Sequence, residues 1–329
     1  MVRRGAVIIV RKLIRNFIIF YSIAYMFTTY LKRFGFKRKE RLFSQEKYTR
    51  INGISVHYLF KPANTNSTNA PTIIFIHGIL ASCRSWDNIT PHFSSFNTYA
   101  IDLLQCGLTE RVNKVIHFPE LADEITGFIK KMNIKNPIIV SHSLGAMVGL
   151  EVASRKENNV KALVFESGIT KLPIPRYYNL IGRMFLLSPF FYIISYLVTR
   201  GILPVGQGIL EKAVYNKAIL TDEFKRRYGA YLLSGVGTNI ARDFLSFEGY
   251  SLSKKTIQSV MCPVLVIMGD KDPLVPLSKT DIAALMKMLP DAELITFTDT
   301  GHMPHEEKRD EFLVNAYDFI ISAHKHEHV

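Results

Sequence analysis

The sequence predicts an α/β fold with a mainly parallel sheet and helices on both faces of that sheet. Three observations support this prediction. Short apolar runs rich in β-branched residues alternate with longer stretches of helical periodicity, as in strands joined by crossover helices. Several of these runs end in turns that contain glycine. With 329 residues and a hydrophobic content of 48%, the chain is long and apolar enough for one large core plus an insertion.

The strands are predicted in the following order. Residues 48–58 read as a hairpin, because Asn52-Gly53 lies at their centre and this dipeptide favours a tight two-residue turn. The later strands are apolar runs, at 71–76, 98–101, 137–140, 160–165, 263–268 and 293–297. A helix is predicted over 119–132, and another begins directly after the 137–140 strand and its turn. No internal repeat is present.

The turn after the 137–140 strand has the pattern of a nucleophile elbow. It reads Ser141-His142-Ser143-Leu144-Gly145, a serine between a buried strand and a helix. Such a turn holds its serine in a strained conformation, so small residues are needed two positions before and after it. Gly145 meets this requirement, and Ser141 is a small residue in place of the usual first glycine. Ser143 is therefore the candidate nucleophile.

An oxyanion hole is predicted beside this elbow. The 71–76 strand ends in His77-Gly78-Ile79-Leu80, where the glycine allows a sharp turn. We expect the main-chain N–H groups of Ile79 and Leu144 to converge, as acyl transfer requires. His77 is expected to be a structural residue of the turn.

The candidate acid and base follow in the order that this architecture requires. The 263–268 strand leads into Gly269-Asp270-Lys271-Asp272, where Asp272 is favoured as the acid and Asp270 is expected to shape the turn. After the 293–297 strand comes Gly301-His302, and His302 is the candidate general base. The nearby His305 is expected to be a surface residue.

The chain at this point resembles the α/β-hydrolase superfamily over about residues 46–322. The motifs that carry the resemblance are His77-Gly78, Asp102-Leu103…Gly107, Ser141-x-Ser143-x-Gly145, Gly269-x-x-Asp272 and Gly301-His302. In the family the second motif usually reads Asp-Leu-Pro-Gly-x-Gly. Here Leu104 and Gln105 replace the proline and the first glycine, which leaves the shape of that loop open. The resemblance implies an α/β-hydrolase fold, a structural Asp102, and a likeness to membrane-anchored ester and acylglycerol hydrolases.

The positive charge is concentrated at the N-terminus. The chain has a net charge of +13, and residues 1–50 hold 13 of its 41 basic residues but only 2 of its 28 acidic ones. The rest of the chain is near neutral and shows no basic stripe with interleaved aromatics, which argues against nucleic-acid binding. Its three cysteines, Cys83, Cys106 and Cys262, form no disulfide framework and no metal motif.

Residues 1–45 are predicted to associate with a membrane. The run 16–31 carries no charge, and as a helix its sixteen residues would reach about 24 Å, less than a hydrocarbon core of about 30 Å. Basic residues lie on both sides of it, and several of them share one helical face with Ser22 and Thr29. This pattern favours a helix in or obliquely across the membrane interface. Mitochondrial targeting and a buried extra helix are the alternatives.

The remaining domain boundaries follow from the spacing of the strands. The first part of the core is predicted at 46–169, a helical cap at 170–252 and the second part of the core at 253–329. The cap contains the strongly apolar stretch 184–198. This stretch either packs on the core or provides an acyl-chain pocket or membrane-facing lip.

These patterns predict a serine hydrolase that cleaves carboxylic esters of an apolar, lipid or acyl substrate. The chemistry requires no metal or organic cofactor. The same triad could act on amide, thioester or carbon–carbon bonds, because one fold hosts many reactions. A ligand-binding protein with a degenerate hydrolase body is the non-enzymatic alternative.

Overall fold

The computed structural model describes residues 15–16, 18–27, 29, 46–65, 70–79, 81–112, 114–171, 193, 197, 205–231, 247, 250–275 and 279–325. Its centre is an eight-stranded sheet in the order β1-β2-β4-β3-β5-β6-β7-β8. The strands are β1 (Lys47–Ile51), β2 (Ile54–Lys61), β3 (Thr72–Ile76), β4 (Asn97–Ile101), β5 (Ile138–His142), β6 (Ala162–Glu166), β7 (Val264–Gly269) and β8 (Ala292–Phe297). Each predicted strand is therefore present.

Antiparallel pairing is confined to one end of the sheet. β1 and β2 form the predicted hairpin, with Ile51 opposite Ile54 and positive φ angles at Asn52 and Gly53. β2 also pairs antiparallel with β4, whereas all the pairs from β4 to β8 are parallel. Because β3, β5, β6, β7 and β8 run parallel, the loops that follow them meet at one edge of the sheet. The candidate site residues lie on those loops.

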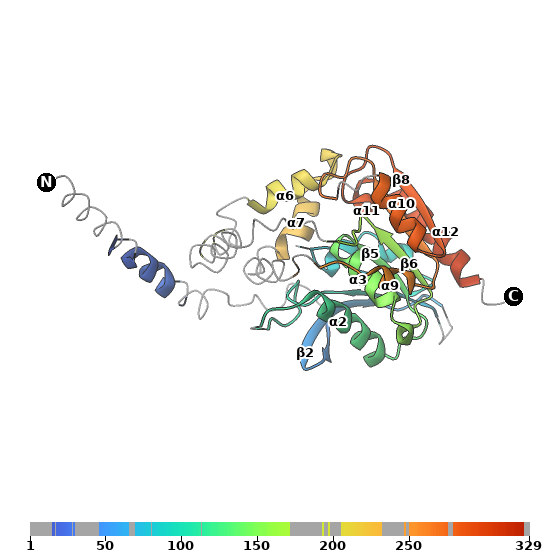
Figure 1. Ribbon diagram of the computed structural model, residues 1–329, viewed down its shortest axis with the longest axis horizontal. Coiled ribbons are helices and arrows are strands. Elements are labelled where there is room, and N and C mark those ends of the chain that lie inside the picture. The colour runs from blue at the N-terminus through green and yellow to red at the C-terminus, as the bar shows by residue number, and fades with distance from the viewer. Residues whose placement is uncertain are drawn as a thin grey trace.

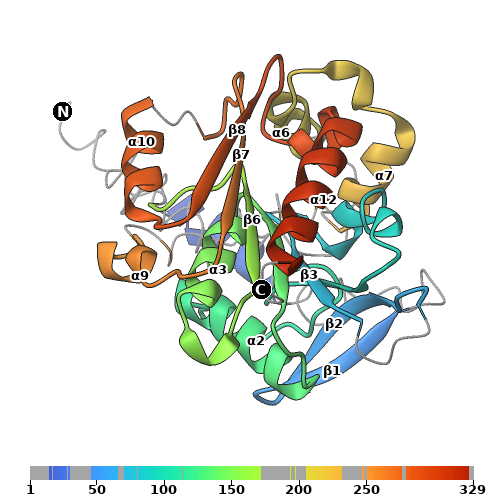
Figure 2. The same cartoon turned by 90° about the vertical axis from the view of Figure 1, so that its right-hand side faces the viewer.

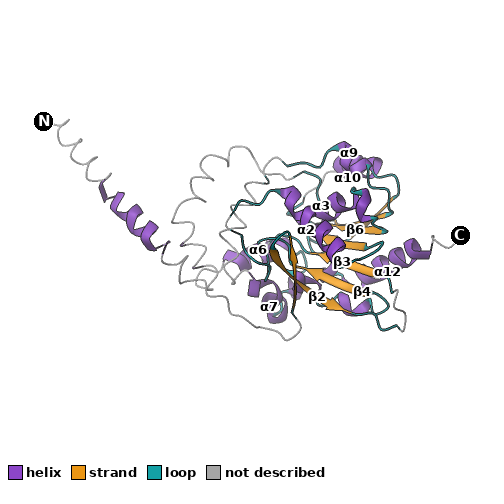
Figure 3. Cartoon of the chain, turned by 90° about the horizontal axis from the view of Figure 1, so that it is seen from below, coloured by secondary structure: helices purple, strands orange, loops and turns teal. Residues whose placement is uncertain are grey.

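Helices cover both faces of the sheet (Figure 2). One face carries α2 (Phe118–Lys131), α3 (Leu144–Ala153), α9 (Lys254–Gln258) and α10 (Lys279–Met288). The other carries the short helices η2 (Cys83–Trp86) and η3 (Thr90–His92), with α12 (Arg309–Lys325). The short α11 (Pro304–Glu307) precedes α12. In Figure 3 the sheet lies between these helical layers.

The side chains of the central strands divide between two cores. In β3, Ile74 and Ile76 face the core under α2 and α3, whereas Ile73 and Phe75 face the core under α12. β6 and β7 alternate in the same way. Because successive side chains of a strand point to opposite faces, a strand covered on both faces is apolar throughout. This explains the uninterrupted apolar runs in the sequence.

An insertion lies between β6 and β7, where the cap is predicted. Its described elements are α6 (Val205–Ala213), η5 (Lys217–Ile219) and α7 (Asp222–Tyr231), which Figure 1 shows on one side of the body. Ala213, Val214, Phe224 and Tyr228 pack with Ala81 and Met303 of the core. Most of the apolar stretch 184–198 falls outside the described residues, and the domain boundaries stay a prediction.

The described N-terminal residues 15–16, 18–27 and 29 are helical. Most of the large apolar side chains in this helix are exposed, with Ile18 at 57%, Phe20 at 61% and Met26 at 64%. Within the described part of the chain, no helix is both long and apolar enough to cross a bilayer.

Candidate active site

Ser143 occupies the strained turn that the sequence predicts. It connects β5 to α3 with φ 55° and ψ −120°, a conformation that residues other than glycine rarely adopt. Its N–H donates to the carbonyl oxygen of Glu166 in the adjacent strand at 2.9 Å. This hydrogen bond to β6 fixes the serine at the edge of the sheet.

The neighbours of Ser143 must be small for a steric reason. A Cβ atom at Gly145 would lie 2.3 Å from the carbonyl oxygen of His77. Ser141 is buried, and its hydroxyl donates to the carbonyl oxygen of Val164 at 3.0 Å. Gly149 makes room for Ser141, because a Cβ there would lie 2.7 Å from the Ser141 Oγ. The serine that replaces the usual glycine is therefore accommodated.

The three candidate triad side chains form a continuous hydrogen-bonded relay. His302 Nε2 lies 2.8 Å from Ser143 Oγ, and His302 Nδ1 lies 2.7 Å from Asp272 Oδ2. All three side chains are buried. With the proton of the imidazole on Nδ1, Nε2 is free to accept the proton of the serine.

The structure distinguishes between the two aspartates that follow β7. Asp272 Oδ1 accepts from the N–H groups of Leu274 and Val275 at 2.8 and 2.9 Å, which leaves Oδ2 for His302. Asp270 is exposed and accepts from Thr300 N and from Lys271 Nζ. Asp270 thus ties the loop after β7 to the loop after β8 and does not touch His302.

The two residues predicted to supply the oxyanion donors lie near each other in the fold. Ile79 lies in the turn after β3, and Leu144 begins α3; both line one apolar pocket. The first N–H groups of a helix have no acceptor within the helix, so the Leu144 N–H can bind an anion. His77 is a structural turn residue as expected: its Nδ1–H donates to Gly78 O at 2.7 Å, and its Nε2 accepts from Leu103 N at 3.1 Å.

Asp102 has the structural environment that the resemblance implies. It is fully buried and accepts from His57 Nδ1 at 2.6 Å, Cys83 N at 2.7 Å and Leu108 N at 2.8 Å. Burial alone would raise the pKa of this carboxyl group. The hydrogen bond and charge of His57 outweigh burial and hold the pKa well below its usual range.

The altered residues of the Asp102 loop are held by contacts of their own. Gln105 adopts a positive φ of 64°, and its side-chain amide donates to Val112 O at 2.8 Å. Leu104 uses its main-chain N–H, which a proline would lack, to donate to Glu124 Oε2 at 2.8 Å. Glu124 lies on α2 and is only 2% exposed. Leucine in place of the family's proline therefore supplies a main-chain N–H group that donates to a buried carboxyl group.

Glu124→Gln is expected to stabilise the protein at neutral pH. Burial raises the pKa of Glu124 well above its ordinary value of 4.5. When folding raises the pKa of a carboxyl group, the free energy of unfolding falls as the pH rises from the ordinary, unfolded pKa towards the folded pKa. A glutamine keeps the acceptor for Leu104 N and does not ionise. Thermal unfolding from pH 4 to pH 8 should show a higher Tm for the variant at pH 8 and a difference that closes near pH 4.

The exposed Glu293→Gln is the control for that measurement and should follow the wild type at every pH. A Tm for Glu124→Gln that is lower than wild type by the same amount at pH 4 and pH 8 would contradict the assignment of an ionisation cost to Glu124.

The loop that carries His302 is held on several sides. The His302 N–H donates to Ala213 O of the insertion at 2.8 Å, and His142 Nε2 donates to the His302 carbonyl oxygen at 2.8 Å. Burial, followed by the neighbouring histidines, holds the pKa of His142 well below its usual range. Glu307 accepts from Gly301 N with one oxygen, and from the N–H groups of Tyr215 and Asn216 with the other. The insertion and His302 therefore share main-chain contacts.

The expectation that His305 lies on the surface is wrong. His305 is fully buried, and its Nδ1 lies 2.9 Å from both carboxylate oxygens of Glu166. Burial alone would lower the pKa of His305, but the charge and hydrogen bond of Glu166 raise it. On its other side, His305 Nε2 lies 3.2 Å from the hydroxyl of Tyr228, which donates to Glu306. Arg227 forms a two-bond ion pair with the same Glu306.

The sequence patterns do not predict this second buried network, which joins His305 to Glu166, Tyr228 and Glu306. Glu166 does follow an apolar strand at the edge where the site forms, which is a usable signal. His305 and Tyr228 carry no such local signal, because their partners lie 139 and 78 residues away in the sequence.

Two buried groups within the described residues bring potential metal-binding atoms within 4.8 Å of one another. They are His57 with Cys83 and Asp102, and His142 with Glu166 and His305. In both groups these atoms already bond one another or the main chain. A hydrogen-bonding role accounts for both groups.

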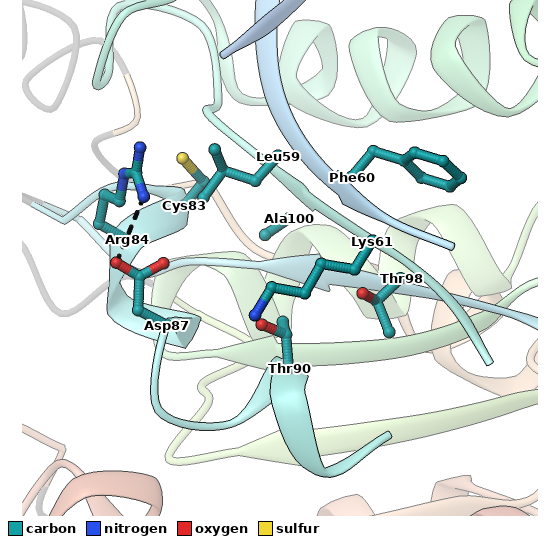
Figure 4. Close-up of a pocket in the computed structure, with 9 residues that line it drawn as sticks. All are labelled: Leu59, Phe60, Lys61, Cys83, Arg84, Asp87, Thr90, Thr98 and Ala100. Carbon is teal, nitrogen blue, oxygen red and sulfur yellow. Dashed lines mark ion pairs between the residues drawn. The ribbon is translucent and has the colours of Figure 1, made fainter. Parts of the chain in front are cut away.

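A second pocket lies away from the relay, between β2, β4 and the segment of η2 and η3 (Figure 4). Arg84 and Asp87 form an ion pair at one end, with 3.6 Å between Arg84 Nη1 and Asp87 Oδ2. Lys61 extends towards Thr90, and burial is the main cause that lowers its pKa. The described residues that line this pocket carry charges of both signs and include no member of the relay.

Comparison with known proteins agrees with the fold. The sequence profile described as the "Alpha/beta hydrolase family" matches residues 73–316. The chain belongs to the α/β hydrolase family. Among related hydrolases, the uncharacterised hydrolase YugF of Bacillus subtilis (strain 168) is 24% identical over 276 residues, covering 82% of this chain and 96% of that protein.

Two solved α/β hydrolase structures share the fold. An esterase of Thermogutta terrifontis superposes with a TM-score of 0.69 at 16% identity, covering 86% of this hydrolase and all of that chain. A membrane phospholipase A, described as a bacterial virulence factor, superposes with a TM-score of 0.68 at 16% identity. That match covers 98% of this hydrolase and 99% of the phospholipase.

Proposed function

We propose that this hydrolase is a membrane-associated serine esterase that cleaves carboxylic esters of apolar acyl substrates. The observation that carries the proposal is the relay from Ser143 through His302 to Asp272, with bonds of 2.8 and 2.7 Å. Such a relay activates a serine for nucleophilic attack.

In the proposed cycle, His302 takes the proton of Ser143 while Oγ forms a bond to the ester carbonyl carbon. The N–H groups of Ile79 and Leu144 stabilise the negative oxygen that develops. His302 then gives the proton to the departing alkoxide, and the alcohol leaves an acyl-enzyme behind. Water, deprotonated by His302, releases the carboxylic acid, and the proton returns to Ser143. Asp272 orients the imidazole and stabilises its cation throughout.

The first experiment is labelling of the detergent-solubilised protein with a fluorophosphonate, followed by turnover of matched p-nitrophenyl ester, thioester and anilide substrates. The proposal expects labelling and faster turnover of the ester than of the thioester or anilide. Labelling with turnover of only the anilide or thioester would keep the triad and replace the substrate class. A folded protein that neither labels nor turns over any of them would support the ligand-binding alternative.

The membrane part of the proposal rests on the N-terminal segment. Apolar side chains are exposed on the 18–27 helix, and the excess positive charge of the chain lies within residues 1–50. Exposed apolar residues beside basic ones favour binding at an anionic membrane surface. Interfacial binding is the mode proposed.

Ile23→Glu is expected to weaken binding to vesicles that contain anionic lipid, because it places a charge on the exposed apolar surface of this helix. Flotation of the full chain with anionic and with neutral vesicles measures the effect. Ser22→Glu makes the same charge change on the polar face and should reduce binding less. Equal losses for both variants would indicate a purely electrostatic contact, and binding unchanged in both would overturn the membrane assignment.

A further inference from the structure

The pocket of Figure 4 is built from segments that are distant in the sequence. β2 contributes Lys61, β4 contributes Thr98, and η3 begins with Thr90. Arg84 of η2 and Asp87, directly after η2, complete the polar part of the lining. The cavity has a volume of about 190 Å³, which is room for a small molecule rather than for a single water. We call this space the Lys61 pocket.

Two buried hydroxyl groups line the Lys61 pocket without a partner. Thr98 is 2% exposed and Thr90 is 7% exposed. Within the described part of the chain, neither hydroxyl group makes a hydrogen bond. Because a buried hydroxyl group without a partner costs free energy, both would be stabilised by an acceptor placed in the pocket.

Lys61 brings a cation to the same place. Although Lys61 is an exposed residue, its side chain extends across the pocket towards Thr90 in Figure 4. Burial lowers the pKa of Lys61 more than the charge of Asp87 raises it, and the charge of Arg84 lowers it further. Among the described residues, Lys61 has no hydrogen-bonding or ion-pair partner. An anion in the pocket would compensate the ammonium group for the water it loses.

The acidic groups near the Lys61 pocket are already engaged by Arg84. Asp87 Oδ2 lies 3.6 Å from Arg84 Nη1, and Glu46 Oε1 lies 3.9 Å from Arg84 Nη2. Burial raises the pKa of Asp87, although the charges of Arg84, Arg227 and Lys61 oppose this shift. The described lining residues thus carry two positive charges and one negative charge. This balance favours an anion over a cation.

The arrangement of donors suits a tetrahedral oxoanion. An ammonium group and two hydroxyl groups can donate from β2, β4 and η3. A phosphate monoester offers three acceptor oxygens in different directions, whereas a carboxylate offers two. Leu59 and Ala100 supply an apolar part of the wall, which suits a small organic group attached to the phosphate.

We infer that the Lys61 pocket binds the phosphate group of a small phosphate monoester through Lys61, Thr90 and Thr98. None of the described residues that line the pocket belongs to the relay, so the inference does not depend on the proposed esterase activity. Arg84 neutralises Asp87 at one end of the pocket and so reduces its repulsion of the anion.

The test is isothermal titration calorimetry of the detergent-solubilised full chain with glycerol 3-phosphate, inorganic phosphate and acetate. Both phosphates should bind with a Kd of about 1 mM or lower, and acetate should bind at least about tenfold more weakly. The same ligands should raise the Tm in proportion to their affinity. Dioctanoyl phosphatidic acid carries the same group on a lipid. If it binds more tightly than glycerol 3-phosphate, the source of the phosphate is a lipid headgroup, and if it binds more weakly, the source is a soluble molecule.

Variants of Lys61 and Thr98 locate the binding. Lys61→Gln should weaken binding of glycerol 3-phosphate by about tenfold or more, and Thr98→Val by about threefold or more. Lys61→Arg and Thr98→Ser keep a donor at each position and should retain most of the affinity. Lys254→Gln and Thr296→Val make the same chemical changes at exposed positions of α9 and β8 and should bind as wild type does.

Blocking Ser143 with a fluorophosphonate separates the Lys61 pocket from the proposed active site, and phosphate binding should persist in the blocked protein. Equal affinities in wild type, Lys61→Gln and Thr98→Val would place the phosphate elsewhere and overturn the inference. Acetate that binds as tightly as phosphate would overturn the assignment of a phosphate group. The inference would also fail if neither calorimetry nor the Tm showed binding at up to about 10 mM glycerol 3-phosphate.

Discussion

Ser143→Ala is expected to reduce kcat/KM for an ester substrate by a factor on the order of 10⁶, as loss of a triad nucleophile does elsewhere. The variant removes only the hydroxyl that lies 2.8 Å from His302 Nε2. Alanine keeps the Cβ atom, so the strained turn at φ 55° is neither relieved nor worsened. Thermal unfolding should therefore be close to wild type, and fluorophosphonate labelling should disappear.

Ser141→Gly is the matched control for this prediction. It also removes a buried hydroxyl from the elbow, but one that bonds to Val164 O and not to His302. Labelling should persist in the control, with a rate within about tenfold of wild type. If Ser143→Ala folded normally and still turned over the ester, the nucleophile would have to be another residue.

Asp272→Asn should lower kcat by about 10⁴-fold with little change in KM, by analogy with the same change in a serine protease triad. The asparagine can keep its acceptor oxygen towards Leu274 N and Val275 N, which Asp272 Oδ1 now serves. Its NH₂ group would then face His302 Nδ1 and force the imidazole proton onto Nε2. In that tautomer Nε2 cannot accept the proton of Ser143. Steady-state kinetics over a pH series measures the loss.

Asp270→Asn offers a control two residues away. Asp270 accepts from Thr300 N and Lys271 Nζ and makes no contact with His302. Its replacement should lower the Tm slightly and leave kcat within a small factor of wild type. Similar losses of kcat in the two variants would show that the integrity of the loop, rather than the carboxylate beside His302, determines activity.

The parts of the fold and site that the sequence predicts are those encoded over short distances. A buried strand shows itself as a run such as Ile73–Ile76, because both of its faces are covered. The order of the elbow, acid and histidine follows from strands that are parallel in the sheet. Local turn chemistry favours Asp272 over Asp270 without deciding between them, and the structure places Asp272 against His302.

Features that depend on two distant segments were not predictable in the same way. The hydrogen bond from Leu104 N to Glu124 Oε2 joins a loop to the next helix. The sequence shows only that this loop lacks the proline usual in the family. The prediction of a surface position for His305 is wrong because its partners are distant from it in the sequence. Its burial depends on Glu166, on the ring of Trp86 at 4.7 Å and on Tyr228 of the insertion.

The contacts between the insertion and the His302 loop have a consequence for how this region can vary among homologues. Ala213, Tyr215 and Asn216 reach His302 and Glu307 through main-chain atoms alone. Main-chain atoms are the same in every residue except proline, so these contacts persist when the exposed side chain of Tyr215 is exchanged, whereas the buried Ala213 is also constrained by its packing. A residue added or deleted there would shift the whole set by about 3–4 Å. Residues 213–216 should therefore accept substitutions at the exposed Tyr215, small apolar residues at Ala213 and Val214, and very few changes of length.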